Sequence, residues 1–373
     1  MQEPARPAAD TLDAATGILP SQHLAQLLAQ GEIRTNRSLD EDQIQPASLD
    51  LRLGPVAYRV RASFLPGADF KVADKLDHFA MHRMDISDGA VLERGCVYIV
   101  PLQESLALAP ARSAIGNPKS STGRLDVFTR LITDHGAEFD RVRPGYTGPL
   151  YAEIAPRTFS VLVREGSRLS QLRIRHGGTS GDDGQLSRLT GDAHPASRIQ
   201  PVSVDVRGEE PEGLIGYRAK AHAGLIDIDR RGHYAIRDFW EPVHARHDQG
   251  LVLDPGEFYI LASKEAVNIP PDQAAEMVAY DTLVGEFRVH YAGFFDPGFG
   301  HAEAGGSGAR AVLEVRSYEV PFVLEHGQTV GRLIYEPLTE RPDQLYGVGR
   351  LQSSYQRQGL SLSKHFLKPE LTG

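Results

Sequence analysis

The chain has 373 residues, 41% of them hydrophobic, and a formal net charge of −9 without a long basic run. This charge argues against a nucleic-acid-binding protein, which usually presents a basic face, and no apolar run approaches the roughly 18 residues of a membrane span. The single cysteine, Cys96, excludes an internal disulfide framework and fits a reducing compartment. We therefore expect a cytoplasmic protein.

Residues 1–15 are rich in Ala, Pro and Asp, carry no secretory signal pattern and are expected to be disordered. Residues 21–31 predict a short helix, because Ser21 can cap it, leucines share one face and Gly31 suits the exit. After that, short apolar stretches with a period of two, such as residues 48–53, are punctuated by Gly or Pro. This pattern predicts a mainly β protein built as a sandwich or barrel.

Three sequence features recur with one offset of 161 residues. They are the glycines of two similar segments, Gly95 and Gly256; the glutamates Glu153 and Glu314; and the glycines Gly166 and Gly327. Solenoid repeats have periods of roughly 20–50 residues, so this spacing instead indicates a duplicated domain. Comparing the copies then shows which one has kept its chemistry.

A weaker echo of residues 46–52 at residues 201–207 places the start of the second copy near residue 200. Residues 224–246 are predicted to be extra material in that copy. The chain is predicted to divide, after the N-terminal residues, into a first catalytic domain at 16–176, a linker rich in Gly, Ser, Thr and Asp at 177–200, a degenerate second domain at 201–340 and a C-terminal tail at 341–373.

The strongest local signal is the loop at residues 116–124, which gathers Lys119, Ser120, Ser121 and Arg124. Hydroxyls, backbone N–H groups and cations are what a polyphosphate needs, although the order is not that of a Walker A loop. The alternative is a solvated polar turn. The matching stretch of the second copy, residues 277–285, has lost the Ser pair, the Lys and the Arg, which favours a function in the first copy.

These residues resemble those of the dCTP deaminase family, within the trimeric dUTPase-like superfamily. Residues 46–54 resemble its N-terminal region, and the loop resembles its triphosphate loop Arg-Ser-Ser-x-x-Arg, with Lys119 in place of the first Arg. Residues 144–148 resemble its Asp-Pro-Gly-Trp-x-Gly turn. The resemblance implies tandem dUTPase-like distorted β-barrel or jelly-roll units and a homo-oligomer such as a homotrimer.

The resemblance also implies site residues. Glu153 falls on the catalytic glutamate of the family, and residues 355–359 resemble the tail that closes over bound nucleotide. The residues expected to bind substrate are Lys119, Ser120, Ser121, Arg124, Tyr151, Ala152, Tyr346, Tyr355 and Gln358.

Several positions depart from the family pattern. Arg143 stands where the Asp of Asp-Pro-Gly is expected, and Asp140 is a candidate to supply that carboxylate. Ser354 stands where the tail has a Lys. The second copy keeps Asp296 and Glu314 but not the phosphate loop, so a complete site can draw on both halves.

Two other motifs suggest different chemistry. His301-Ala302-Glu303 resembles the His-x-Glu of zinc-dependent deaminases, but these need a Pro-Cys-x-x-Cys partner, and Cys96 is alone. Residues 224–232 resemble the dUTPase motif whose Asp activates the hydrolytic water, but they lie upstream of the position of the lost loop. A charged turn is the simpler interpretation of the first motif, and a segment without a catalytic role is the simpler interpretation of the second.

Without zinc, deamination must depend on a carboxylate. Glu153 is expected to activate a water against C4 of cytosine, with Mg²⁺ carried on the triphosphate. Three functions remain open from the sequence: a dCTP deaminase that yields dUTP and ammonia, a dUTP diphosphatase or bifunctional enzyme, and a non-catalytic nucleotide-sensing protein. Nucleotides are the expected partners, with no nucleic acid and no membrane.

Overall fold

The computed structural model describes residues 15–177, 198–208, 213–245, 250–279, 287–290, 293–348, 355–356 and 358–368. The protein is mainly β, as the sequence predicts. Of the predicted disordered N-terminus and linker, residues 1–14 and 178–197 lie outside the described residues. None of the helices in the described part is long and apolar enough to cross a membrane.

The helices are short. The first, α1, begins at Ser21, whose predecessor Pro20 is the N-cap, so the prediction that Ser21 caps the helix is wrong. It buries Leu24 and Leu27 and ends before Gly31, which has a φ of 77°. The described helices are α1 (Ser21–Ala29), α2 (Val72–Phe79), α3 (Ser120–Gly123), α5 (Ile236–Phe239) and the 3-10 turn η2 (Ala302–Ala304).

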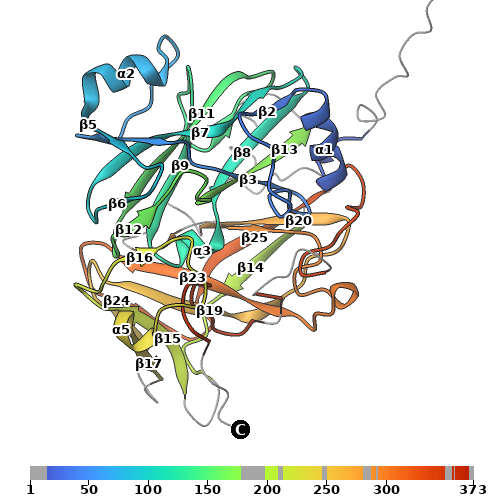
Figure 1. Ribbon diagram of the computed structural model, residues 1–373. Helices are drawn as coiled ribbons and strands as arrows, with labels where there is room; N and C mark the ends of the chain where they lie inside the picture. The colour runs from blue at the N-terminus through green and yellow to red at the C-terminus, as the bar shows by residue number, and fades with distance from the viewer. Residues whose placement is uncertain are drawn as a thin grey trace, which may run out of the picture.

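The first half contains two larger sheets and a small one (Figure 1). One sheet has the order β1-β13-β8-β10, with β3 beside β13, and comprises Gly17–Ile18, Ser170–His176, Arg112–Pro118, Arg141–Val142 and Leu49–Leu51. The other has the order β5-β4-β7-β11-β9, with β2 beside β7, and comprises Ala80–Asp85, Val56–Val60, Val97–Ala107, Thr147–Pro156, Val127–Thr133 and Ile33–Thr35. The small sheet pairs β6 (Ala90–Leu92) with β12 (Val161–Val163).

The second half repeats these orders. The order β14-β25-β20-β22 comprises Arg198–Ser203, Thr329–Pro337, Gln273–Ala279 and Phe294–Phe295. The order β17-β15-β19-β23-β21 comprises Trp240–His244, Leu214–Ala219, Phe258–Val267, Ala309–Ser317 and Phe287–His290. The small sheet pairs β18 (Leu251–Leu253) with β24 (Phe322–Leu324). The recurrence in sequence is therefore a recurrence of architecture.

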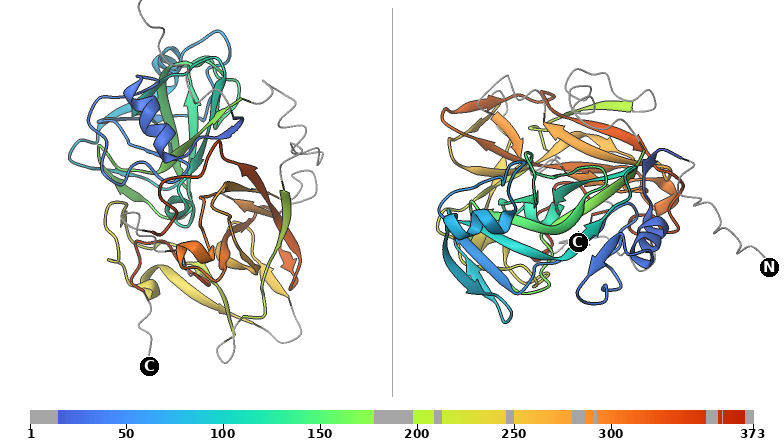
Figure 2. Two further views of the ribbon diagram at one scale, coloured as in Figure 1. Left: turned by 90° about the vertical axis from the view of Figure 1, so that its right-hand side faces the viewer. Right: turned by 90° about the horizontal axis from the view of Figure 1, so that it is seen from above.

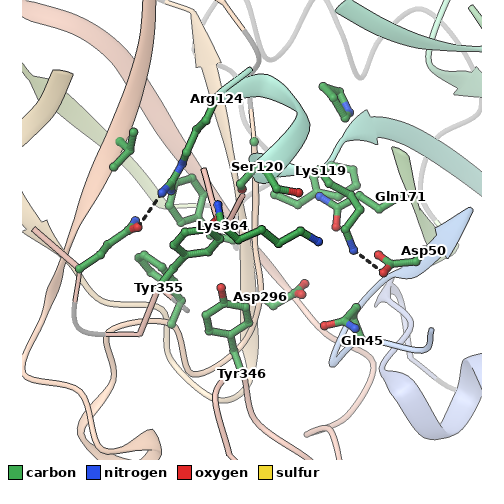
Figure 3. Close-up of a pocket in the computed structure, with 18 of the residues that line it drawn as sticks. Gln45, Asp50, Lys119, Ser120, Arg124, Gln171, Asp296, Tyr346, Tyr355 and Lys364 are labelled. Atoms are coloured by element: carbon green, nitrogen blue, oxygen red, sulfur yellow. Dashed lines mark hydrogen bonds and ion pairs between the residues drawn. The ribbon is translucent and has the colours of Figure 1, made fainter. Parts of the chain in front are cut away.

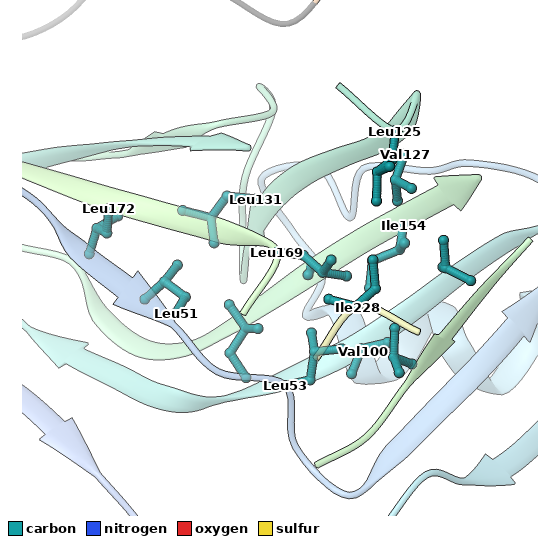
Figure 4. Packing of buried hydrophobic residues seen from close by; sticks show 14 of the residues in the cluster. Leu51, Leu53, Val100, Leu125, Val127, Leu131, Ile154, Leu169, Leu172 and Ile228 are labelled. Atoms are coloured by element: carbon teal, nitrogen blue, oxygen red, sulfur yellow. The ribbon is translucent and has the colours of Figure 1, made fainter. Parts of the chain in front are cut away.

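The prediction that residues 224–246 are extra material in the second copy is wrong. Both copies place a loop, a short helix and a strand at this point: α2 and β5 in the first copy, α5 and β17 in the second. The course of the loop differs, because β16 (Ile226–Asp227) pairs in parallel with β12 of the first copy. Ile228 is buried among the leucines of the first core (Figure 4).

One hydrophobic cluster spans the two halves and the C-terminal tail, beside a separate core within the second half. Phe366 lies 5.5 Å from Phe239 and 6.0 Å from Trp240, measured between ring centroids. Leu362 is buried in the same cluster. The tail is outside both repeats in sequence but is part of the folded core. Its red ribbon rises between the two halves toward the first one (Figure 2).

Buried ion pairs fix one half against the other. Arg173 of β13 donates to Asp296, with Nη2 3.1 Å from Oδ1, and both side chains are buried. Arg316 of β23 pairs with Asp126, which follows α3. Removing one partner of such a pair costs about 3–5 kcal/mol. The halves are therefore held in one register, and this register determines which side chains meet between them.

Candidate active site

A cavity of about 390 Å³ lies between the two halves (Figure 3). Its walls come from the first copy, the second copy and the tail. Among the described residues that line it are Asp50, Lys119, Ser120, Ser121, Arg124, Arg231, Met277, Phe294, Phe295, Asp296, Val312, Glu314, Tyr346, Tyr355, Gln358 and Lys364.

The predicted phosphate loop forms one wall. Strand β8 ends at Pro118, and Lys119 caps the single turn of α3 that begins at Ser120. The Lys119 ammonium pairs with Asp50 of β3, and its backbone N–H donates to the Leu169 carbonyl at 2.9 Å. Both hydroxyls, the Lys and Arg124 line the cavity, so the structure brings the predicted loop residues together.

Glu314 of β23 supplies a carboxylate to the same cavity. Its side chain is 5% exposed, and its Oε1 lies 4.0 Å from Nε of Arg124 in the phosphate loop. Burial raises the pKa of Glu314 to about 8, and the Arg124 guanidinium opposes this only in part. A carboxyl group that titrates near neutral pH is suited to take and return protons.

Glu153 is not among the described residues that line the cavity. It lies on β11 directly opposite Arg130 of β9, whose Nε donates to Glu153 Oε1 at 3.0 Å. The Arg130 guanidinium also stacks on Phe139, 3.4 Å from the ring centroid. The predicted meeting of Glu153 with the phosphate loop is therefore not found, because the loop of one copy faces the glutamate of the other.

Tyr151 and Ala152 also lie away from the cavity. Tyr151 packs in an apolar cluster with Ile99 and Ile132, and Ala152 is fully buried in the main core. Strand β11 lines the cavity with none of its described residues, whereas Val312 of the equivalent strand β23 does line it. The interpretation of the first copy as the one that supplies this strand does not agree with the geometry.

Asp140 and Arg143 are also placed elsewhere. Asp140 Oδ1 accepts the Leu131 backbone N–H at 2.7 Å, which closes the connection between β9 and β10. Arg143 is exposed, with its guanidinium 6.0 Å from the Tyr146 ring centroid. The carboxylate of the Asp-Pro-Gly turn in the cavity is Asp296, from the second copy.

Described residues of the tail lie against the phosphate loop. Tyr346, Tyr355 and Gln358 all line the cavity. The Arg124 guanidinium lies 4.1 Å from the Tyr355 ring centroid, and its Nη1 donates to Gln358 Oε1 at 3.0 Å. Ser354, which departs from the family pattern, lies outside the described residues.

Sequence reasoning missed several residues of the cavity. Asp50 lies in the segment that carries the resemblance, and its pairing with Lys119 could have been proposed from charge alone. Asp296 was named as a retained residue of the second copy, and it lines the cavity. Lys364 and Arg231 carry no motif, and only the tertiary structure shows them at this site.

The apolar part of the cavity comes from the second copy. Met277, Phe294, Phe295 and Val312 provide hydrophobic and aromatic surface beside Glu314. Arg173 lies over the Phe294 ring, 4.0 Å from its centroid, while it pairs with Asp296. An apolar wall, a carboxylate and a cationic loop in one cavity suit a ligand with a flat base at one end and phosphates at the other.

The two motifs that suggested other chemistry have structural partners. His301 Nδ1 accepts the backbone N–H of Glu303 at 3.2 Å, and Glu303 pairs with Arg341. Asp227 is held by two hydrogen bonds from Arg164, at 2.8 and 2.9 Å. In the described part of the chain, no group of three or more His, Cys, Asp or Glu side chains is arranged to hold a metal ion.

Comparisons with known proteins agree with the resemblance. The domain described as "2'-deoxycytidine 5'-triphosphate deaminase (DCD) N-terminal domain" matches residues 15–178, and the corresponding C-terminal domain matches residues 186–366. The crystal structure of 2'-deoxycytidine 5'-triphosphate deaminase from Agrobacterium tumefaciens is 57% identical, with a TM-score of 0.79 over 87% of this chain and 99% of that one.

Shorter relatives match as well. Proteins from Corynebacterium jeikeium and Kocuria rhizophila, both named "dCTP deaminase, dUMP-forming", are 30% and 33% identical. The matches span 47% and 43% of this chain and 88% and 77% of the relatives. The chain therefore belongs to the dCTP deaminase family.

Proposed function

We propose that this protein converts dCTP and water to dUTP and ammonia at one composite site per chain. The observation that carries the proposal is the meeting of Glu314 of the second copy with Arg124 of the first-copy phosphate loop, 4.0 Å apart in one cavity. The second copy supplies the carboxylate and the apolar wall, and the first copy supplies the cationic loop. The release of ammonia from dCTP by the purified protein tests this directly.

Glu314 is proposed as the group that moves protons. It takes a proton from water as the water oxygen attacks C4 of cytosine, and gives this proton to N3. It then moves the second proton of the added hydroxyl to the exocyclic amine, which leaves as ammonia. Arg124 steadies the carboxylate form of Glu314 when the proton has been given up. The apolar neighbours exclude bulk water, which strengthens these interactions.

The pH dependence of kcat/KM follows from the raised pKa of Glu314. A general base must be deprotonated in the free enzyme, and the pKa of Glu314 is about 8. We expect kcat/KM for dCTP to rise about tenfold per pH unit below this value and to level off above it. The measurement is initial ammonia release between pH 6 and 9.5. A profile that is flat across this range contradicts the assignment.

Mg²⁺ is proposed to arrive with the triphosphate, whose negative charge it offsets. The cavity suits such a complex, since Oδ1 of Asp50 is buried beside Lys119 without a hydrogen-bond partner in the described residues. This oxygen can accept a hydrogen bond from a water of the Mg²⁺ shell. Zinc is not part of the proposal.

We expect activity to be lost on removal of Mg²⁺ and to be indifferent to a zinc-selective chelator. Dialysed enzyme is assayed with Mg²⁺, with Zn²⁺, and with Mg²⁺ plus the chelator, and its zinc content is measured by atomic absorption. Bound zinc at one per chain, with activity that only zinc restores, would overturn the zinc-independent mechanism.

A second candidate is the formation of dUMP, either from dCTP or from dUTP as substrate. The observation in its favour is the printed name of the relatives, which are dUMP-forming. Asp227 of the dUTPase-like motif does not support it, since Arg164 holds this carboxylate. Chromatography of the same assay separates the outcomes: dUTP with ammonia alone supports the first proposal, and dUMP with pyrophosphate supports the second.

The finer architecture is also a proposal. We infer that the halves are dUTPase-like barrel or jelly-roll units with the predicted boundaries, supported by their matching strand orders. A homo-oligomer is supported by apolar side chains exposed on and beside the β18–β24 pair, namely Val252, Val320 and Val323.

A further inference from the structure

A smaller cavity of about 190 Å³ adjoins the first one beyond the phosphate loop. The two cavities share Asp50, Lys119, Arg231 and Lys364. Glu314 and the apolar wall of the second copy line only the first. The site therefore runs from Glu314 and the apolar wall, past the loop, to a chamber lined with charged side chains. The carboxylates there are Asp40, Asp50 and Asp229.

Four cations line this chamber, namely Lys119, Arg168, Arg231 and Lys364. Lys119 pairs with Asp50, and Arg231 Nη2 lies 3.9 Å from Asp42 Oδ2. The Lys364 ammonium has no hydrogen bond or ion pair with any described residue. Figure 3 shows it extending across the cavity toward Lys119. The positive charge of the Lys364 ammonium is therefore not balanced by a paired carboxylate of the described residues.

The electrostatic environment of Lys364 leads to the same conclusion. Burial, followed by the charges of Lys119 and Arg231, lowers the pKa of this lysine to about 7, against the opposing carboxylate of Asp50. Arg168 adds a further positive charge nearby. A buried cation among other cations is costly until an anion binds. The other three cations have aspartate partners, so the Lys364 ammonium is the charge in this chamber that an anionic group of a ligand can pair with.

The backbone holds Lys364 and Arg231 together. Gly232, next to Arg231, donates its N–H to the Lys364 carbonyl at 2.9 Å, and the Lys364 N–H donates to the Tyr355 hydroxyl at 3.0 Å. His365 Nε2 donates to the Ile228 carbonyl at 2.8 Å. The loop that follows β16 and the tail therefore form one interlocked unit that presents both cations.

We propose that Lys364 and Arg231, together with Lys119, form the subsite for the outermost phosphate of the bound nucleotide and so determine the preference for a triphosphate. The inference rests on the proposed function, in which the base lies toward Glu314. Each added phosphate then extends the ligand past Ser120 and Lys119 into the smaller cavity. A monophosphate is too short to reach it.

Calorimetric titration with dUMP, dUDP and the non-hydrolysable α,β-imido-dUTP, in the presence of Mg²⁺, tests this subsite. Lys364→Gln and Arg231→Gln should each weaken the triphosphate about 10–100-fold, as loss of a charge-assisted hydrogen bond implies, and change dUMP less than threefold. Lys364→Arg should restore most of the triphosphate affinity. Equal weakening of dUMP and the triphosphate by both variants would overturn the proposal.

Two matched controls use neighbouring cations. Lys368→Gln changes an exposed lysine of the tail, and Arg230→Gln changes an arginine that pairs with Asp227; neither residue is among the described lining of either cavity. Both controls should keep the full preference for the triphosphate. If they lose it as Lys364→Gln does, the effect is one of general surface charge and the subsite is refuted.

The binding series separates the two proposals. If the wild-type protein shows the phosphate-length preference but releases no ammonia from dCTP, the subsite stands and the proposed function fails. If dCTP is deaminated but Lys364→Gln and Arg231→Gln keep the preference, the proposed function stands and the subsite fails. Melting temperatures close to the wild type show that each variant is folded.

Discussion

Glu314→Gln is expected to lower the rate of ammonia release from dCTP by on the order of 10²–10⁴-fold. The amide has nearly the same shape as the carboxyl group but cannot accept the proton of the attacking water. Because Glu314 lies beside Arg124 without a hydrogen bond from it, the substitution leaves no hydrogen bond of the loop unmade. The measurement is kcat at saturating dCTP, with ammonia determined by an enzyme-coupled assay.

Binding should survive this substitution. The phosphate loop, the tail and the apolar wall are unchanged in Glu314→Gln. The dissociation constant for a non-reacting dCTP analogue should therefore stay within about threefold of its value for the wild-type protein. A loss of binding as large as the loss of turnover would show that Glu314 holds the substrate and does not move protons.

Arg124→Ala is expected to lower kcat/KM for dCTP by about 10²-fold or more and to affect deoxycytidine much less. The guanidinium lines the cavity within the phosphate loop, and a charge-assisted bond to phosphate contributes about 1.5–3 kcal/mol. Arg124 also donates to Gln358 and to the Ser361 carbonyl and stacks on Tyr355, so its loss releases the tail as well. Initial rates with both substrates measure the difference.

The matched control for this prediction is Arg130→Gln. Arg130 pairs with Glu153, the equivalent glutamate of the first copy, but it is not among the described residues of the cavity. Its replacement should leave kcat/KM within about threefold of the wild type. If Arg124→Ala weakens deoxycytidine as much as dCTP, Arg124 is a structural residue of the tail contact.

The sequence predicted what depends on local pattern. Short-range spacing of apolar residues predicts the helix that begins at Ser21 and the strand at Leu49–Leu51. The phosphate loop could be predicted too, because Lys119, Ser120, Ser121 and Arg124 are close in sequence and one copy has lost them. The tail residues Tyr355 and Gln358, proposed from the resemblance, line the same cavity.

The sequence could not predict which glutamate meets the loop. Glu153 and Glu314 occupy equivalent strands with similar neighbours, and the choice between them is made by packing of one half on the other. Buried pairs such as Arg173 with Asp296 fix that packing over long sequence distances. The loop before β17 was misread for a related reason, since its partner β12 lies in the other copy.

The position of the tail changes how its role can be tested. Phe366 and Leu362 belong to the core, so removal of the whole tail would expose apolar surface and lower stability as well as activity. Point substitutions that leave these two side chains in place, such as those at Arg124 and Lys364, separate closure over the ligand from folding.

The central claim is that the second copy supplies the reacting carboxylate to the phosphate loop of the first. The most direct test compares Glu314→Gln and Glu153→Gln in one assay of ammonia release from dCTP, at equal concentrations of folded protein. We expect Glu314→Gln to lose at least about 10²-fold in kcat while Glu153→Gln keeps a rate within about threefold of the wild type. The reverse order, with Glu153→Gln inactive and Glu314→Gln close to normal, would contradict it.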